Sequence, residues 1–149
     1  MMRDYPSELQ QVFSDYRADL EACREKYKPT DGLLGLSRSM NDDVCHDRFD
    51  ERVKTLSAEF ASSRPSSETA ARMIRMLLFP EDFQSWPTSA QWMLRAAERH
   101  SIPLIPFLSR EDAGLFCQQY VLRYPPRDRL PVQKKVCKAL LSMCPERIK

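Results

Sequence analysis

Apolar side chains return at steps of three and four residues through most of this sequence, and prolines stand between the segments that carry this spacing. The step matches the 3.6 residues of one α-helical turn, so each segment predicts an amphipathic helix. Proline interrupts a helix because it lacks an amide hydrogen and clashes with the preceding turn. Eleven prolines and only three glycines occur. The pattern therefore predicts an all-α fold, a compact single-domain bundle of about six short amphipathic helices with Pro-rich connectors.

The predicted helices begin near residues able to cap a helix, and most of them end near proline. Their approximate ranges are 7–27, 42–61, 67–78, 88–100, 109–122 and 131–144. Caps are expected from Ser7 with Gln10, from Ser66 or Ser67, from Thr88 with Gln91, and from Ser109 with Asp112. Residues 29–41 are expected to form a loop. The apolar stretch 102–108 holds two prolines, so an extended or single-turn segment laid across the core is expected there.

The length of 149 residues fits one domain spanning 1–149, with the C-terminal segment 121–149 packed on it. A chain of this size can bury roughly 70% of the surface that it exposes when unfolded. Apolar residues make up 42% and charged residues 30% of the chain, as in ordinary globular proteins. These values exclude a collagen-like or wholly disordered chain but name no function.

Basic side chains gather in segment 121–149. The net charge of the whole chain is +2, yet this segment holds eight basic and two acidic residues. Six of the basic residues are candidates for binding nucleic acid or another anion: Arg123, Arg127, Arg129, Lys134, Lys135 and Lys138. Tyr120 and Tyr124 lie beside them, at positions from which an aromatic ring could stack on a base. The alternative is a solvated face, or one paired with acidic side chains elsewhere in the fold.

Two further observations concern possible binding surfaces. If the helix over 88–100 packs beside the helix over 131–144, Arg95, Arg99 and Arg110 would enlarge the basic patch, unless they pair with nearby acidic residues such as Glu98. Three aromatic residues, Phe83, Trp86 and Trp92, lie in or beside the connector before that helix. They either seal the core or form a surface for contact with a protein partner.

Metal-ligand residue types occur, but not at the spacings of known sites. Asp43, Asp47 and Asp50 share one helical face, as carboxylates around a hard cation would, yet they equally suit a solvated first turn that complements the helix dipole. Cys45 and His46 are adjacent and point about 100° apart, which is unsuited to one shared zinc ion. A buried thiol beside a surface imidazole is expected instead. We expect no metal and no cofactor.

Catalytic motifs are also missing from the sequence. No phosphate-binding glycine loop, nucleophile elbow or zinc-protease motif occurs. A thiol–imidazole pair such as Cys117 with His100 would have to be assembled by the fold. The five cysteines are odd in number and widely spaced, which argues against a disulfide framework.

A cellular context and a role follow as expectations. No apolar run approaches the roughly 18–20 residues of a membrane span, and the first residues lack the apolar run of a signal peptide. We therefore expect a cytoplasmic protein with no membrane contact. The favoured function is a non-enzymatic interaction or regulatory module that binds another macromolecule, with a protein as partner. The first alternative is a nucleic-acid-associated protein that uses the basic segment, and the second is a metal- or thiol-dependent enzyme.

Overall fold

The computed structural model describes residues 3–27, 35–80 and 91–143. Over these ranges the chain forms six α-helices, two short 3₁₀ helices and no strand, which confirms the predicted all-α class. The elements are α1 (Tyr5–Tyr27), α2 (Gly35–Ser62), α3 (Ser67–Leu78), α4 (Gln91–Ser101), η4 (Ile102–Phe107), α5 (Arg110–Arg123), η5 (Pro126–Asp128) and α6 (Pro131–Met143).

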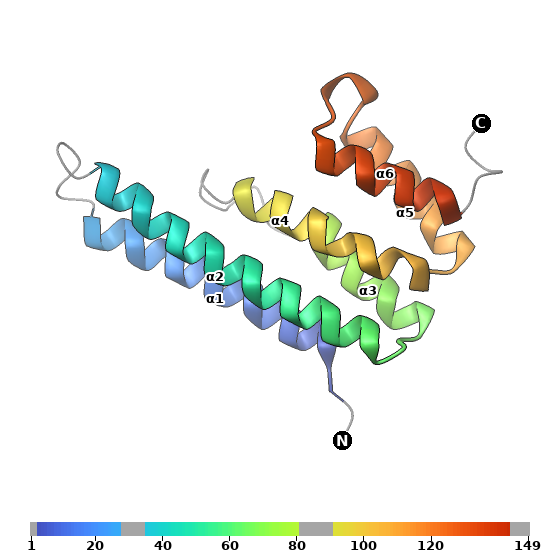
Figure 1. The fold of residues 1–149 in the computed structure, drawn as a ribbon, viewed down its shortest axis with the longest axis horizontal. Helices are drawn as coiled ribbons and strands as arrows, with labels where there is room; N and C mark the ends of the chain where they lie inside the picture. Colours follow the sequence, from blue (N-terminus) through green and yellow to red (C-terminus); the bar gives the residue numbers. More distant parts are fainter. Residues whose placement is uncertain (1–2, 28–34, 81–90, 144–149) are drawn as a thin grey trace.

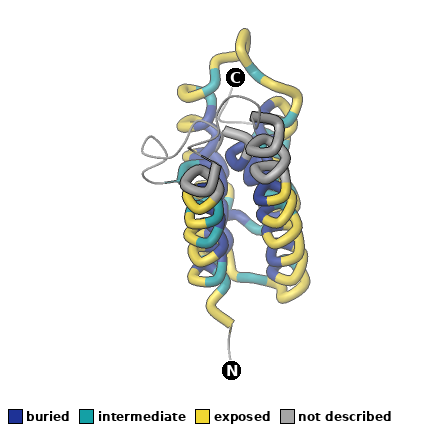
Figure 2. Tube along the Cα trace, turned by 90° about the vertical axis from the view of Figure 1, so that its left-hand side faces the viewer, coloured by how far each residue is buried: buried dark blue, intermediate teal, exposed yellow. Residues whose placement is uncertain are grey.

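The helices pack in three successive pairs (Figure 1). Helices α1 and α2 run side by side, α3 and α4 lie against this pair, and α5 and α6 cover α3 and α4 from the other side. Helix α4 therefore contacts both α2 and α6. Buried positions face the spaces between the helices and exposed positions face outward (Figure 2), as expected when each helix buries one apolar stripe.

The apolar stripes of the sequence become the core. Those of α2, α3 and α5 are buried at Cys45, Phe49, Val53, Leu56 and Phe60, then at Ala70, Met73, Ile74, Leu77 and Leu78, and then at Ala113, Phe116, Cys117 and Tyr120. Helix α3 carries five residues at 0% exposure in twelve positions. This density arises because α1, α4, α5 and η4 all contact α3.

Two helix starts differ from the prediction. Helix α1 begins at Tyr5, and the Ser7 amide donates to Asp4 Oδ1 at 3.2 Å, so the cap is Asp4 and the predicted cap at Ser7 with Gln10 is wrong. Pro6 is tolerated because it lies in the first turn, where its missing amide hydrogen has no partner in any case. Helix α2 begins at Gly35, so the loop predicted over 29–41 is wrong from residue 35 onward. No proline interrupts the chain between Gly35 and the end of α2.

Other local predictions agree with the structure. Ser66 accepts from the Thr69 amide at 3.2 Å and Ser109 from the Asp112 amide at 3.1 Å, so both serines cap their helices. The predicted cap at Thr88 lies outside the described residues. For 102–108 the prediction of an extended segment is wrong, because residues 102–107 form the six-residue 3₁₀ helix η4, which packs on α6, α3 and α4. Within the described ranges, none of the helices has the length and apolar character needed to cross a bilayer.

We predict that α3 is the most sensitive element of the core. Leu77→Ala removes a fully buried side chain and leaves a cavity, which should lower the free energy of unfolding by about 2–5 kcal/mol. The matched control is Leu115→Ala on α5, where the side chain is 43% exposed and the change should stay within about 1 kcal/mol. Urea denaturation followed by circular dichroism measures both values. Equal losses for the two variants would contradict the prediction.

Candidate functional site

A basic groove lies where α4, η4 and the start of α6 meet. Its volume is about 550 Å³. It is lined by Arg95 and Arg99 of α4, by Ile102 and Pro103 of η4, and by Leu130, Pro131, Val132 and Lys135 at the start of α6. Helix α4 does pack beside α6, as the enlarged basic patch required. The predicted alternative also holds in part, because Arg95 pairs with Glu98 at 2.6 Å and Arg99 lies 3.9 Å from Asp50. Arg110 is exposed and does not line the groove. Arg95 and Arg99 stand one helical turn apart, so they occupy the same side of α4.

The groove combines positive charge with an apolar surface. Three of its lining residues are cationic and none is acidic, while the other five are apolar. Leu130 is 44% exposed, although a large apolar side chain is usually covered. Such a surface attracts an anionic group through its cations and an apolar group through its leucine, isoleucine, valine and prolines.

Behind the groove, Arg95 is held by a buried carboxylate. Its Nη1 donates to Glu98 Oε1 at 2.6 Å, and Glu98 is 0% exposed. The Tyr120 hydroxyl donates to Glu98 Oε2 at 2.5 Å from α5. Burial raises the pKa of Glu98 above its ordinary value, against the lowering effect of the bonds from Tyr120 and Arg95. Both carboxylate oxygens therefore have a donor, as a buried carboxylate requires.

Tyr124 extends this cluster toward the basic segment. Its ring lies 4.9 Å from that of Tyr120, and the guanidinium carbons of Arg95 and Arg123 lie 5.8 Å and 5.7 Å from its centroid. The Arg129 Nε donates to the Tyr124 carbonyl at 2.9 Å. These are cation–π and hydrogen-bond distances. The half-buried ring of Tyr124 thus contacts Arg95 and Arg123, and its backbone carbonyl binds Arg129.

The structure distributes the six predicted basic residues over several environments. Lys135 lines the groove, while Arg123 and Arg129 contact Tyr124. Three others, Arg127 on η5 and Lys134 and Lys138 on α6, are exposed. Tyr120 is fully buried, so the prediction that it could stack on a base is wrong. Its ring is drawn inward because its hydroxyl has a buried partner in Glu98.

The aromatic candidates for a protein contact are not tested by the structure. Phe83 and Trp86 lie outside the described residues, and so does the side chain of Trp92.

The acidic residues of α2 contribute to packing. Asp50 Oδ1 bonds with His100 Nε2 at 2.6 Å and lies 3.9 Å from Arg99 Nη1, which joins α2 to α4. Asp47 is exposed, and the side chain of Asp43 lies outside the described residues. Across the described part of the chain, no three histidine, cysteine or acidic side chains converge on a point that could hold a metal ion.

One prediction for the thiol and imidazole residues is wrong. Cys45 is buried as expected, but His46 is also buried, with its ring 5.8 Å from that of Tyr16 on α1. Position 46 precedes Phe49 by three residues, so it shares the inner face of α2 despite its polarity. Of the other pair, His100 faces Asp50 on α2, whereas Cys117 is buried on α5.

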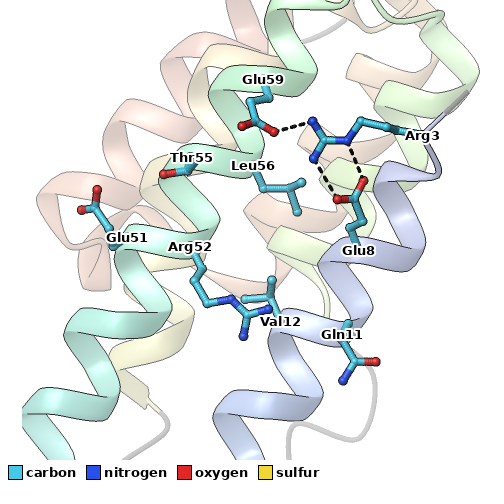
Figure 3. Close-up of a pocket in the computed structure, with 9 residues that line it drawn as sticks. All are labelled: Arg3, Glu8, Gln11, Val12, Glu51, Arg52, Thr55, Leu56 and Glu59. Carbon is cyan, nitrogen blue, oxygen red and sulfur yellow. Dashed lines mark hydrogen bonds and ion pairs between the residues drawn. The ribbon is translucent and has the colours of Figure 1, made fainter.

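A second concavity, of about 420 Å³, lies between α1 and α2 (Figure 3). Arg3 reaches between Glu8 and Glu59 there, with nitrogen–oxygen distances of 2.8 Å and 2.5 Å. Arg52, which also lines it, pairs with Asp15 at 2.8 Å. Opposite charges therefore neutralise one another in this concavity. The groove beside α6 has cations but no acidic lining residue, and it is the stronger candidate for binding a charged partner.

Comparisons of the chain with protein-family models, with curated proteins and with solved structures find no significant match. The sequence predicted that Arg95 and Arg99 would join the basic patch if the helix that carries them packs beside α6. The burial of Glu98 and its bond to Tyr120 were not predicted. A signal was present, because Glu98 follows Leu94 by four residues and therefore stands on the same side of α4.

We predict that the bond from Tyr120 to Glu98 stabilises the fold. Tyr120→Phe leaves one buried carboxylate oxygen without a donor, which should lower the free energy of unfolding by about 1–3 kcal/mol. Tyr5→Phe is the control, because its hydroxyl makes only a 3.5 Å contact with the Glu59 carbonyl. Urea denaturation at neutral pH compares the two. A loss that is no larger for Tyr120→Phe than for the control would show that the bond contributes nothing.

Glu98 should also make stability depend on pH. Its pKa is raised in the folded state above the usual 4.5, so the protonated form favours folding. This contribution is complete below about pH 4.5 and is lost as the pH rises through the folded-state pKa. Glu98→Gln stays neutral at every pH. Denaturation at intervals from about pH 4.5 to about pH 7.5 should show the wild type losing stability relative to Glu98→Gln as the pH rises, whereas parallel curves would contradict this.

Proposed function

We propose that this chain is a non-enzymatic interaction module that docks an acidic, partly apolar segment of another protein in the groove between α4, η4 and α6. The observation that carries the proposal is the set of three cations, Arg95, Arg99 and Lys135, around an apolar surface with no acidic lining residue. Arginine suits a carboxylate partner because its planar group can donate two parallel hydrogen bonds. Apolar side chains of the same segment would cover Ile102, Leu130 and their neighbours.

A protein segment fits this groove better than a nucleic acid. Single-stranded nucleic acids are usually held by aromatic rings on which bases stack. Tyr120 is fully buried, and Tyr124 is half-buried beside two guanidinium groups. The five apolar lining residues have no counterpart in a phosphate backbone. Nucleic acid remains the alternative, with the exposed Arg127, Lys134 and Lys138 as the residues that would contact phosphates.

We further propose that the module works in the cytoplasm. The support is that Cys137 is a buried free thiol, which is the usual state of cysteine in a reducing compartment.

Charge reversal in the groove tests the proposed function. The probe is a fluorescent peptide in which aspartate alternates with leucine, titrated with protein at near-physiological salt. Lys135→Glu and Arg99→Glu should each weaken binding about tenfold or more, because each places a like charge beside the anionic peptide. The matched control is Lys54→Glu, which changes the net charge equally from an exposed position of α2 outside the groove. Leu130→Ala should weaken binding by removing apolar contact area.

The outcomes separate the two proposed partners. Peptide binding that is weakened by Lys135→Glu but not by Lys54→Glu supports the protein-docking module. An oligonucleotide of equal charge serves as the competing probe. If it binds more tightly than the peptide, and its affinity falls steeply with added salt, the nucleic-acid alternative replaces the proposal. If neither probe binds even at low salt, the groove has no role in binding anions.

A further inference from the structure

Arg95 takes part both in the groove and in the buried hydrogen-bond cluster around Glu98. It lines the groove, and its guanidinium is also bonded to the fully buried carboxylate of Glu98 at 2.6 Å. The Arg95 side chain is 28% exposed whereas that of Glu98 is 0% exposed. An anion that reaches Arg95 from the groove would therefore share this cation with a carboxylate that solvent cannot screen. The charge of Glu98 acts on the groove at short range.

The ionisable side chains around Glu98 must be considered as well, because any of them that changes protonation would also change the charge near Arg95. They are Arg95 on α4, Tyr120 and Arg123 on α5, Tyr124 after α5, and Cys137 on α6. Burial and the bond to Glu98 raise the pKa of Tyr120, and burial raises that of Cys137, so both stay neutral near pH 7. The arginines stay charged at every relevant pH. Protonation of Glu98 is thus the one event within this set that alters the charge next to Arg95.

We propose that Glu98 regulates the groove: the ionised carboxylate partly neutralises Arg95 and weakens anion binding, and the protonated carboxyl releases Arg95 and strengthens it. This inference rests on the proposed function and names how that site is controlled. By linkage, an anion bound in the groove must equally favour protonation of Glu98, so binding takes up protons from solution. Proton uptake is a signature that a purely structural role for Glu98 would not produce.

The test uses a probe whose own charge is constant. A peptide in which leucine alternates with cysteic acid keeps its sulfonates ionised throughout the range from about pH 5 to about pH 8. Wild-type affinity for this peptide should rise as the pH falls. Glu98→Gln keeps a carbonyl oxygen for Arg95 but stays neutral, so it should bind about three- to tenfold more tightly than the wild type at the upper pH and show a flatter profile. Calorimetry in buffers of different ionisation enthalpy should detect proton uptake by the wild type only.

Two further variants isolate Glu98 from other groups. His100 lies near the groove, but it bonds with Asp50 on α2 and does not line the groove. His100→Gln should therefore keep the wild-type pH profile. Tyr120→Phe removes a donor that favours the ionised carboxylate, so it should shift the profile toward higher pH. This shift keeps the inference testable if Glu98→Gln folds poorly.

The results distinguish failure of the regulation from failure of the site. If the probe binds, but the wild type and Glu98→Gln show the same pH profile and no difference in proton uptake, Glu98 does not regulate the groove and the docking proposal stands. If His100→Gln flattens the profile instead, the histidine is responsible and the inference is overturned. If neither the wild type nor Glu98→Gln binds the probe at any pH, the proposed groove fails and the inference fails with it.

Discussion

Two hydrogen bonds hold α4 from opposite sides. His100 bonds with Asp50 of α2 at 2.6 Å, and Glu98 accepts from Tyr120 of α5 at 2.5 Å. Positions 98 and 100 point about 200° apart around a helix, so the two bonds tie α4 to α5 on one side and to α2 on the other. Leu94 and Ala97 of α4 are buried in the core. Arg95 and Arg99 line the groove beside α6.

Placing the carboxylate of Glu98 in the core costs free energy. An ionised carboxylate loses several kcal/mol of hydration on burial, and its partners restore that only when their geometry is good. Here the two oxygens have one donor each, and the raised pKa shows that desolvation outweighs the two bonds. An apolar side chain of similar size would avoid this penalty. The fold bears this penalty at a carboxylate that is bonded to an arginine of the groove.

The two concavities both contain basic side chains, but the acidic partners of these side chains lie in different places. Between α1 and α2, Arg3 and Arg52 are bound by Glu8, Glu59 and Asp15. These exposed pairs join the two long helices, and each contributes little energy by itself. Beside α6, the acidic partner of Arg95 is placed behind the groove rather than in it, and Lys135 lies among apolar residues. The two concavities therefore differ in where their acidic side chains lie more than in how many basic side chains they contain.

The sequence by itself determined the helices and most of the core. Apolar spacing located the buried stripes of α2 and α3, since burial of one face is what the spacing encodes. In α6 it missed Gln133 and Cys137, which are buried. It misplaced the starts of α1 and α2, because Ser7 with Gln10 matches a capping box and Asp4 does not, and because Leu36 and Met40 are the only large apolar residues in 35–41. It also left His46 on the surface, because hydropathy judges a residue by type and burial depends on which face it occupies. Only the tertiary structure decided the groove, whose residues come from 95–103 and 130–135. These two segments meet because α4 packs beside α6. Likewise, Tyr120 donates to Glu98 only because the fold brings α5 close to α4.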